Sequence, residues 1–464
     1  MAVHPAFDAP RTPPHRAAGP RPAPRVAPRV APRVVAAGLH VCGWVGAAAV
    51  LGLWWADTSS VVGPAGWLTG AGRITGLLAG YACAVIVVLM ARVPWLDRTV
   101  GSDRLARWHA AGGRYAVSLV VAHALLIVWG YALTGHVGPV EQTGRLVLHY
   151  PEMLKATAAW FLFLLTAAVS ARAARRRLSY ETWHLLHLAT YAAVFLAFGH
   201  QLADGADFVG DRGAQLVWYA MYLSAAALVL WFRFLVPLRS ARRHRLTVTD
   251  VRQEGPGVVS VVLTGERLDE LGALPGQFFR WRFLAPGLWW SANPYSLSAP
   301  ADPRFLRITV KALGGHSAAL AGVRPGTRVW AEGPYGALVA RNAPADRALL
   351  LAGGIGITPL RALFETLPGD LILVHWARTP ADLVLRTELD ALADRRGARV
   401  HYSVDEPAGH ALPLTSCALT ALVPDLGRRE VYLCGPPGMT AAAEAALREA
   451  GVAPHRIHQE SFAL

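Results

Sequence analysis

Five histidines fall inside two of the long apolar stretches of the chain, where an ionisable side chain is costly and therefore needs a role. They are His109 and His123 in the stretch 106–133, and His184, His187 and His200 in the stretch 181–203. On an α-helix, the step from His109 to His123 rises about 21 Å and the step from His187 to His200 about 19.5 Å. The two stretches therefore present imidazoles at two matching depths.

Both stretches are expected to cross a membrane in the same direction, which pairs His109 with His187 and His123 with His200. Two imidazoles that face each other across a bundle are axial ligands for a haem iron, so the spacing predicts two b-type haems. The alternative is an ordinary helix contact for each histidine. The step from His187 to His200 is about 140° out of register, so a kink or bulge is expected there unless His184 takes part. We interpret His184 as a structural residue or as one that supports a haem-binding residue.

Six apolar stretches are long enough to cross a hydrocarbon layer of about 30 Å. They are 34–55, 73–94, 106–133, 153–172, 181–203 and 213–236. Arginines gather in alternate loops and after the last stretch, so the positive-inside rule predicts a multi-pass protein of the cell membrane with both termini in the cytoplasm. Residues 1–33, rich in Pro, Ala and Arg, are interpreted as a disordered basic tail.

Composition excludes several classes of protein. The residues AVILMFWYC make up 53% of the chain, which argues against an ordinary cytosolic enzyme and for a lipid bilayer as partner. The formal net charge of +14 does not indicate nucleic acid, because its arginines lie between the apolar blocks. The four cysteines form no CxxC pair, so they predict neither a disulfide framework nor a metal site.

The pattern changes after residue 244. Short β-like runs separated by Gly and Pro turns come first, and strand-like runs that alternate with helical stretches follow from about 346. We therefore expect a multi-domain protein: an α-helical membrane bundle of six transmembrane helices over 34–238, a β-barrel domain over 242–343 and an α/β nucleotide-binding domain over 346–464.

The segment Asn293-Pro294-Tyr295-Ser296 resembles the flavin motif Arg-x-Tyr-Ser of the ferredoxin–NADP reductase superfamily. The resemblance implies FAD, with Tyr295 packed on the isoalloxazine ring and Ser296 hydrogen-bonded near its reactive nitrogen. Asn293 stands where the family has an arginine that holds a flavin phosphate. A second segment resembles the phosphate-binding loop of the family, and its residues are Lys311, Gly314, Gly315 and Ser317.

Two glycine turns resemble the nucleotide site of the same superfamily. The first follows an apolar run and has the form GGxGxxP, with Gly353, Gly354, Gly356, Thr358 and Pro359. The second is Cys434-Gly435-Pro436, a turn that in the family borders the nicotinamide, which implies NAD(P)H as electron donor. Phe462 resembles the terminal aromatic residue that covers the flavin, and the alternative is a tail that only packs on the core. The residues expected to act in catalysis are Ser296, Cys434 and Phe462.

With these motifs behind the histidine-bearing stretches, the chain resembles the ferric reductase / NADPH oxidase superfamily. The resemblance implies an NAD(P)H-dependent flavocytochrome b oxidoreductase. A hydride would pass from cytosolic NAD(P)H to FAD, and single electrons would then pass through an inner and an outer haem to a small-molecule acceptor outside. The flavin suits this role because it accepts two electrons and releases them singly.

Ferric complexes are the favoured acceptor. Ile127 stands one turn beyond His123, where oxidases of the superfamily often carry another histidine, which weakens the alternative of O2 reduction to superoxide. Arg73 corresponds to an arginine beside the outer haem of those oxidases, and its alternative is a snorkelling residue. The sequence is also compatible with an electron donor to a partner protein or quinone, with a haem sensor that has a degenerate reductase, and with a homo-oligomer.

Overall fold

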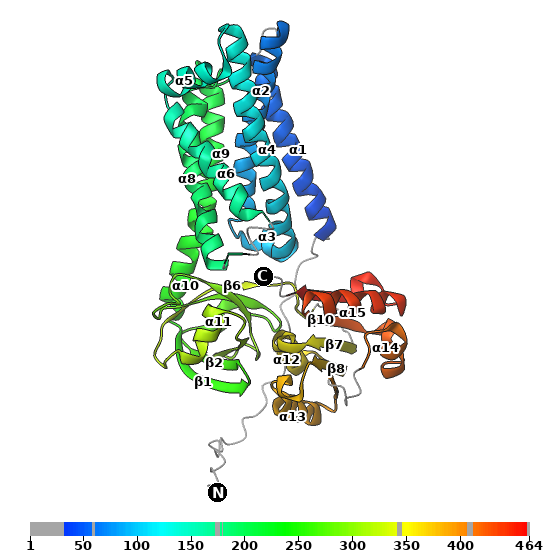
Figure 1. The fold of residues 1–464 in the computed structure, drawn as a ribbon. Coiled ribbons are helices and arrows are strands. Elements are labelled where there is room, and N and C mark those ends of the chain that lie inside the picture. The colour runs from blue at the N-terminus through cyan, green and yellow to red at the C-terminus, as the bar shows by residue number, and fades with distance from the viewer. Residues whose placement is uncertain are drawn as a thin grey trace.

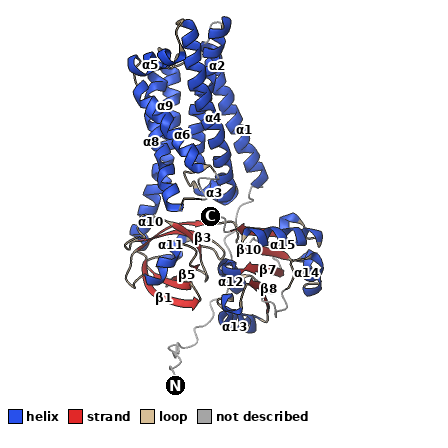
Figure 2. Cartoon of the chain, viewed as in Figure 1, coloured by secondary structure: helices blue, strands red, loops and turns tan. Residues whose placement is uncertain are grey.

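The computed structural model describes residues 32–57, 61–171, 177–178, 180–340, 346–405 and 412–461. A bundle of long helices stands on two sheet-containing domains, and the start of the first long helix lies at the same end of the bundle as these domains (Figure 1). The strands of the described residues all lie in the lower domains, which also contain helices, whereas the bundle above them is helical (Figure 2).

Within the described residues, six helices are long and apolar enough to cross a membrane, which confirms the predicted number of spans. They include α1 (Pro32–Asp57), α2 (Gly63–Leu89), α4 (Ser102–Thr134), α6 (Met153–Ser170) and α8 (Tyr180–Asp204). The sixth span begins as α9 (Arg212–Leu230) and continues through a π-helical turn, η1 (Trp231–Leu235), into α10 (Val236–His244). The short helices α3 (Pro94–Thr99) and α5 (Pro139–His149) lie in the connections.

The second span differs from its predicted bounds of 73–94. The helix begins ten residues earlier, at Gly63, with a proline in its first turn. The segment before Arg73 contains four glycines, which lower its apolar content and so conceal the start of the helix. Arg73 therefore lies within the helix rather than at its outer end.

The expected interruption of the fifth span is not present. The helix α8 is α-helical from Tyr180 to Asp204, and the π-helical turn lies in the sixth span instead. Positions 140° apart on a helix can each lie about 70° from a common facing direction. Flexible side chains on an unbroken α-helix can therefore both turn toward α4.

The first sheet domain contains two three-stranded antiparallel sheets around one core. Their orders are β1-β2-β5 and β4-β3-β6, formed by β1 (Thr247–Gly255), β2 (Val258–Thr264), β3 (Phe278–Phe283), β4 (Asn293–Ser296), β5 (Leu306–Lys311) and β6 (Val329–Tyr335). Single bridges join the sheets at both pairs of edges, Thr247 with Arg328 and Leu297 with Ile308. The domain is therefore barrel-like.

The second sheet domain is a parallel α/β layer structure with the strand order β11-β10-β7-β8-β9. Its strands are β7 (Arg347–Gly353), β8 (Asp370–Ala377), β9 (Arg399–Val404), β10 (Glu430–Gly435) and β11 (Ile457–Ser461). The helices α12 (Ile357–Thr366), α13 (Arg386–Arg396), α14 (Ser416–Leu422) and α15 (Pro437–Glu449) lie between them in sequence. The central strands are apolar and buried on both faces, as a parallel sheet requires.

Candidate functional site

The structure brings the four paired histidines together across the bundle. The ring centres of His109 and His187 lie 5.9 Å apart, and those of His123 and His200 lie 6.3 Å apart. Two metal–nitrogen bonds of about 2 Å, together with the radii of the two rings, span close to this separation. Each pair therefore has the spacing that one iron ion between two imidazoles requires.

Backbone carbonyl groups of α2 orient the two histidines of α4. Nδ1 of His109 lies 3.0 Å from the carbonyl oxygen of Ile86, and Nδ1 of His123 lies 2.8 Å from that of Gly72. A carbonyl oxygen can only accept, so Nδ1 carries the proton and the lone pair stays on Nε2. Metal-binding histidines are commonly held in this tautomer by a hydrogen bond from the nitrogen that faces away from the metal. The donor set therefore fits a pair of haem groups.

The partner histidines on α8 have different surroundings. Nδ1 of His187 lies 3.3 Å from the hydroxyl oxygen of Ser170, and Trp183 stacks on its ring at 5.1 Å. Nδ1 of His200 is buried and has no hydrogen-bond partner among the described residues. His184 is not part of either pair, and it lies within electrostatic range of Arg233 and Arg92 and of Arg280 in β3.

Arg73 forms an ion pair near the upper end of the bundle. Its Nη2 lies 2.5 Å from Oδ1 of Asp207, and its Nε donates to Oδ2 of Asp207 at 3.3 Å. The Asp207 side chain is only 4% exposed, so the carboxylate needs a nearby cation. Arg73 is thus held by the segment between α8 and α9.

The predicted flavin segment forms β4 beside β3, with Ser296 opposite Phe278 and Tyr295 opposite Phe279. The Trp281 indole donates to the carbonyl oxygen of Tyr295 at 2.9 Å. Within the described residues, Nδ2 of Asn293 and Oγ of Ser296 are buried without a hydrogen-bond partner. Such orphaned polar atoms are rare in finished structures, and they fit a polar ligand at this strand.

The predicted phosphate-binding loop precedes a short helix, α11 (Gly315–Ala319). The hydroxyl oxygen of Ser317 accepts from the backbone N–H of Leu313 and of Gly314, at 2.9 and 3.1 Å. Lys311 points elsewhere, because its Nζ lies 2.8 Å from Oδ1 of Asp382 in the α/β domain. Lys311 therefore links the two sheet domains.

The two glycine turns contact each other at the ends of β7 and β10. A Cβ atom on Gly356 would lie 2.2 Å from the carbonyl oxygen of Cys434, and one on Gly353 would lie 2.3 Å from Sδ of Met439. Both positions therefore require glycine. Thr358 and Pro359 lie in the first turn of α12 and are buried. The segments that the sequence predicts to hold NAD(P)H are thus adjacent.

Two regions match known protein families. Residues 75–198 match the family described as "Ferric reductase like transmembrane component", and residues 350–445 match "Oxidoreductase NAD-binding domain". One chain thus contains a segment similar to the ferric reductase-like transmembrane component and, after it, a segment similar to the NAD-binding oxidoreductase domain. The two matches fall on the segments that carry three of the four paired histidines and the glycine turns, and they confirm the resemblance seen in the sequence.

Relatives of the chain include proteins named as a reductase subunit and as an NADPH oxidoreductase. It is 33% identical over 203 residues to the stachydrine N-demethylase reductase subunit of Rhizobium meliloti, covering 40% of this chain and 58% of that one. It is 35% identical over 242 residues to an NADPH oxidoreductase of Mycobacterium tuberculosis, covering 49% of this chain and 62% of the relative. The chain thus spans about three fifths of the length of these relatives.

Among solved structures, the chain is similar to the flavohem-like FAD/NAD-binding domain of a nitric oxide dioxygenase from Vibrio cholerae. The identity is 25% and the TM-score 0.42, over 48% of this chain and 99% of that one. A ferredoxin–NADP+ reductase from Neisseria gonorrhoeae with bound FAD and NADP is 19% identical with a TM-score of 0.41, over 47% of this chain and 97% of that one.

Two residues beside the glycine turns were missed by sequence reasoning. His375 in β8 is buried, and burial lowers its pKa to about 4. It is therefore neutral, and Nε2 lies 3.1 Å from the carbonyl oxygen of Gly354, to which it donates. Glu460 in β11 lies opposite Cys434 and packs against Gly336. Neither residue belongs to a motif with a fixed spacing.

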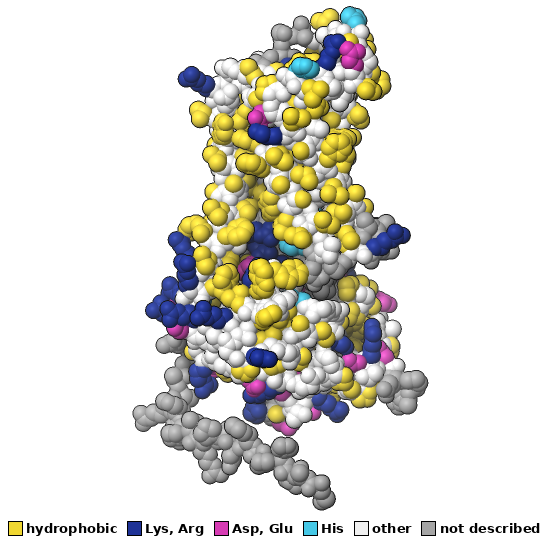
Figure 3. All heavy atoms as spheres, turned by 60° about the vertical axis from the view of Figure 1, so that its left-hand side comes forward, with side chains coloured by type: hydrophobic (Ala, Val, Ile, Leu, Met, Phe, Trp, Pro, Cys, Tyr) yellow, Lys and Arg dark blue, Asp and Glu magenta, His cyan; other side chains and the backbone are white. Residues whose placement is uncertain are grey.

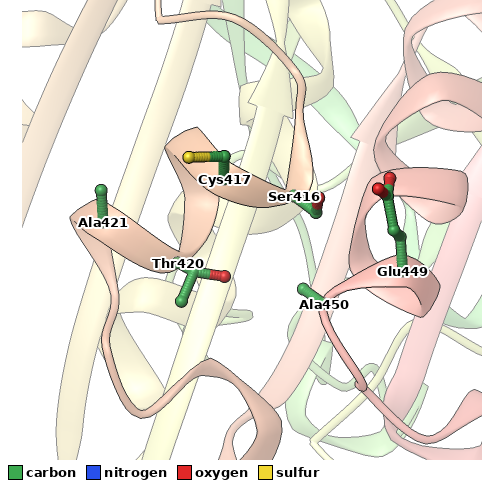
Figure 4. Close-up of a pocket in the computed structure, with 6 residues that line it drawn as sticks. All are labelled: Ser416, Cys417, Thr420, Ala421, Glu449 and Ala450. Carbon is green, nitrogen blue, oxygen red and sulfur yellow. The ribbon is translucent and has the colours of Figure 1, made fainter.

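Two of the residues predicted to act in catalysis lie toward the end of the chain. Burial, and to a smaller extent the Glu460 carboxylate, raises the pKa of the Cys434 thiol, so this thiol stays protonated at neutral pH. Phe462, predicted to cover the flavin, lies outside the described residues. A surface hollow between α14 and α15 (Figure 4) has none of the predicted site residues in its lining, which consists of Ser416, Cys417, Thr420, Ala421, Glu449 and Ala450.

Proposed function

We propose that this chain passes electrons from cytosolic NAD(P)H through FAD and two b-type haems to a one-electron acceptor outside the cell membrane, with ferric iron complexes as the favoured substrate. The two histidine pairs of α4 and α8, with ring centres 5.9 and 6.3 Å apart, carry this proposal. The domain bounds that go with it are 34–238, 242–343 and 346–464, and both termini lie in the cytoplasm.

The lower domains supply the donor side. When bound, FAD takes a hydride from NAD(P)H and gives up its two electrons one at a time. The glycine turns at Gly353 and Gly435 let a pyrophosphate approach the backbone. Ser296 offers a hydroxyl and Asn293 an amide to the flavin, and Tyr295 offers a ring. Buried Cys434, and Phe462 at the chain end, would border the nicotinamide.

The bundle supplies the path across the membrane. Haem groups held by His109 with His187 and by His123 with His200 would carry one electron at a time. The carbonyl groups of Ile86 and Gly72 fix the ring orientation of the α4 histidines. One NAD(P)H, oxidised to NAD(P)+ with release of a proton, reduces two ferric ions to two ferrous ions.

The charge beside Arg73 bears on the choice of acceptor. Superoxide formation is helped by a free cationic pocket near the outer haem, whereas here the Arg73 guanidinium is matched by the buried Asp207 carboxylate. This pairing supports a ferric complex, or another acceptor that is not O2, as the substrate. A second candidate is electron donation to a partner protein, favoured by relatives whose names describe them as reductase subunits of a demethylase and of monooxygenases.

The test is an anaerobic absorbance spectrum of the detergent-purified protein with FAD, before and after addition of NADPH. Reduced low-spin haem bands that correspond to about two haems per chain are expected. Ferric citrate or air is then added to separate samples. The rate at which the haem bands return to their oxidised form compares the two acceptors. A flavin that bleaches without any haem band would overturn the proposal.

A further inference from the structure

Two charged residues from the two halves of the molecule meet where the bundle rests on the barrel-like domain. The guanidinium of Arg92, in the turn between α2 and α3, forms an ion pair with the carboxylate of Glu332 in β6. Their side chains are only 16% and 8% exposed. A pair removed from water to this degree adds little net stability, and its best-attested use is to select one geometry over others.

The backbone at Arg92 adopts a costly conformation. Its φ is 61°, in the left-handed region that residues with a Cβ rarely occupy. The helix α2 ends just before it at Leu89, and α3 begins just after it at Pro94. A strained residue of this kind persists only where its surroundings hold it. Here the conformation is stabilised by the neighbouring Ala91, which is buried, and by the Glu332 carboxylate, which pairs with the Arg92 side chain.

Further charges surround the pair. Arg280 lies opposite Glu332 in the register of β3 and β6, and Asp97 in α3 interacts with both Arg92 and Arg280. Burial raises the pKa of Asp97 to about 6, although both arginines oppose the shift. Figure 3 shows Lys or Arg side chains in a recess between the apolar bundle and the domains below. The junction is therefore a buried polar contact in an otherwise hydrophobic region.

The pair connects the two parts that must exchange electrons. On one side, Arg92 follows the end of α2, whose Ile86 carbonyl accepts the hydrogen bond from His109. On the other side, Glu332 lies in the strand that continues to Tyr335, whose ring centre is 5.8 Å from that of Phe278. Phe278 is the cross-strand partner of Ser296 in the flavin segment. A short stretch of backbone followed by non-covalent contacts thus joins each member of the pair to one of the two sites.

We propose that the Arg92–Glu332 pair is a positioning contact that fixes the flavin segment at a set distance from the inner histidine pair. Neither side chain takes part in the chemistry, because Arg92 acts through α2 and Glu332 acts through β6. The inference rests on the proposed function, since it assigns the pair to the step between flavin and inner haem.

The experiment separates the two electron-transfer steps in the full-length, cofactor-loaded protein. Arg92→Glu, Glu332→Arg and the double exchange are mixed anaerobically with NADPH in a stopped-flow instrument, and flavin and haem absorbance are followed together. Flavin bleaching is expected at the wild-type rate in all three. Haem reduction is expected to slow by about tenfold or more in each single variant and to recover most of that loss in the double exchange.

Controls keep a folding defect apart from a positioning defect. FAD and haem content per chain is measured for each variant, and the milder Arg92→Gln and Glu332→Gln replace any charge reversal that loses a cofactor. Arg243→Glu breaks an exposed Arg–Glu pair with Glu270 in the lower half and is expected to leave both rates unchanged. Single variants that reduce haem at the wild-type rate, or a double exchange that does not recover, would overturn the inference.

A second measurement does not depend on haem. Hydrogen exchange of the backbone is expected to quicken in both α3 and β6 in each single variant, and to return toward wild type in the double exchange. If the wild-type protein showed no haem at all, the proposed function would fail while this exchange pattern still tested the contact. Unchanged exchange in α3 and β6 would refute the contact itself.

Discussion

A Cβ atom on Gly76 would lie 2.6 Å from Nδ1 of His123, so the backbone of α2 is pressed against the histidine that α4 contributes to the upper pair. The carbonyl of Gly72, one turn earlier, accepts the hydrogen bond from the same nitrogen. The second span is therefore part of the upper site, although it contributes no histidine to it.

Gly76→Ala is expected to displace the His123 ring and to lower the haem content of the upper site. Because a backbone or ring must move to admit the methyl group, we expect about one haem per chain instead of two, measured by absorbance of the purified protein. Gly113→Ala is the matched control, since a Cβ atom there meets nothing within 4 Å. Equal haem content in both variants would contradict this role of α2.

His123→Ala and His200→Ala are each expected to abolish the upper haem and the reduction of ferric citrate. The lower pair and the domains below are untouched, so NAD(P)H-dependent reduction of a soluble dye that takes electrons from the flavin is expected to continue. Steady-state rates with ferric citrate and with the dye measure the two activities separately. Loss of both activities would speak against two stages in series.

Arg73→Ala leaves the buried Asp207 carboxylate without its cation and is expected to destabilise the bundle. Breaking a fully buried pair costs about 3–5 kcal/mol, and because the Arg73 side chain is 21% exposed we expect about 2 kcal/mol. Thermal unfolding in detergent measures the change. The double variant with Asp207→Asn removes the charge left behind and is expected to regain most of the loss. A double variant no more stable than Arg73→Ala would exclude this ion-pair effect.

His375→Leu removes the donor that holds the carbonyl of Gly354, a residue with a φ of 51°. The turn is then less well ordered before the nucleotide binds, so the KM for NAD(P)H is expected to rise about tenfold while the rate of flavin reduction at saturation changes little. His375→Gln keeps an N–H donor and is expected to show a smaller effect. A fall in the saturated rate alone would point to a different role.

The same histidine makes stability depend on pH. Its pKa is about 4 in the folded protein against about 6.5 when unfolded. Between these values the unfolded chain binds the extra proton, so the free energy of unfolding rises with pH across this window and is level above it. Below this window, the free energy of unfolding is lower by up to about 3 kcal/mol than it is above the window. Thermal midpoints between about pH 4 and pH 7 are expected to vary less in His375→Gln.

The sequence predicted the parts that depend on spacing along one helix or one strand. The rise from His109 to His123 matched the rise from His187 to His200, and the glycine turns followed apolar runs, so these residues could be found from the chain alone. The start of α2 at Gly63 was hidden by its glycines. The bulge expected in α8 was wrong, because positions on an unbroken α-helix can both turn their side chains toward α4.

Several features depend on contacts that no local pattern encodes. Glu460 meets Cys434 only because β11 pairs with β10, and His375 meets Gly354 only because β8 lies beside β7. Arg92 was visible in the sequence only as one of the arginines that mark a loop. Its partner Glu332 is 240 positions away, so the pair follows from the packing of the two halves.

The sixth span runs into α10 without an intervening loop, and β1 begins three residues after α10 ends. The two sheet domains, which we propose to supply the electrons, are therefore attached to the bundle through a continuous helix and not through a flexible linker. A separate electron donor that arrives by diffusion works at a rate set by its concentration. A donor domain joined to the bundle by a continuous helix has a constant local concentration. Turnover per molecule should thus be insensitive to dilution, in contrast to systems in which the reductase is a separate subunit.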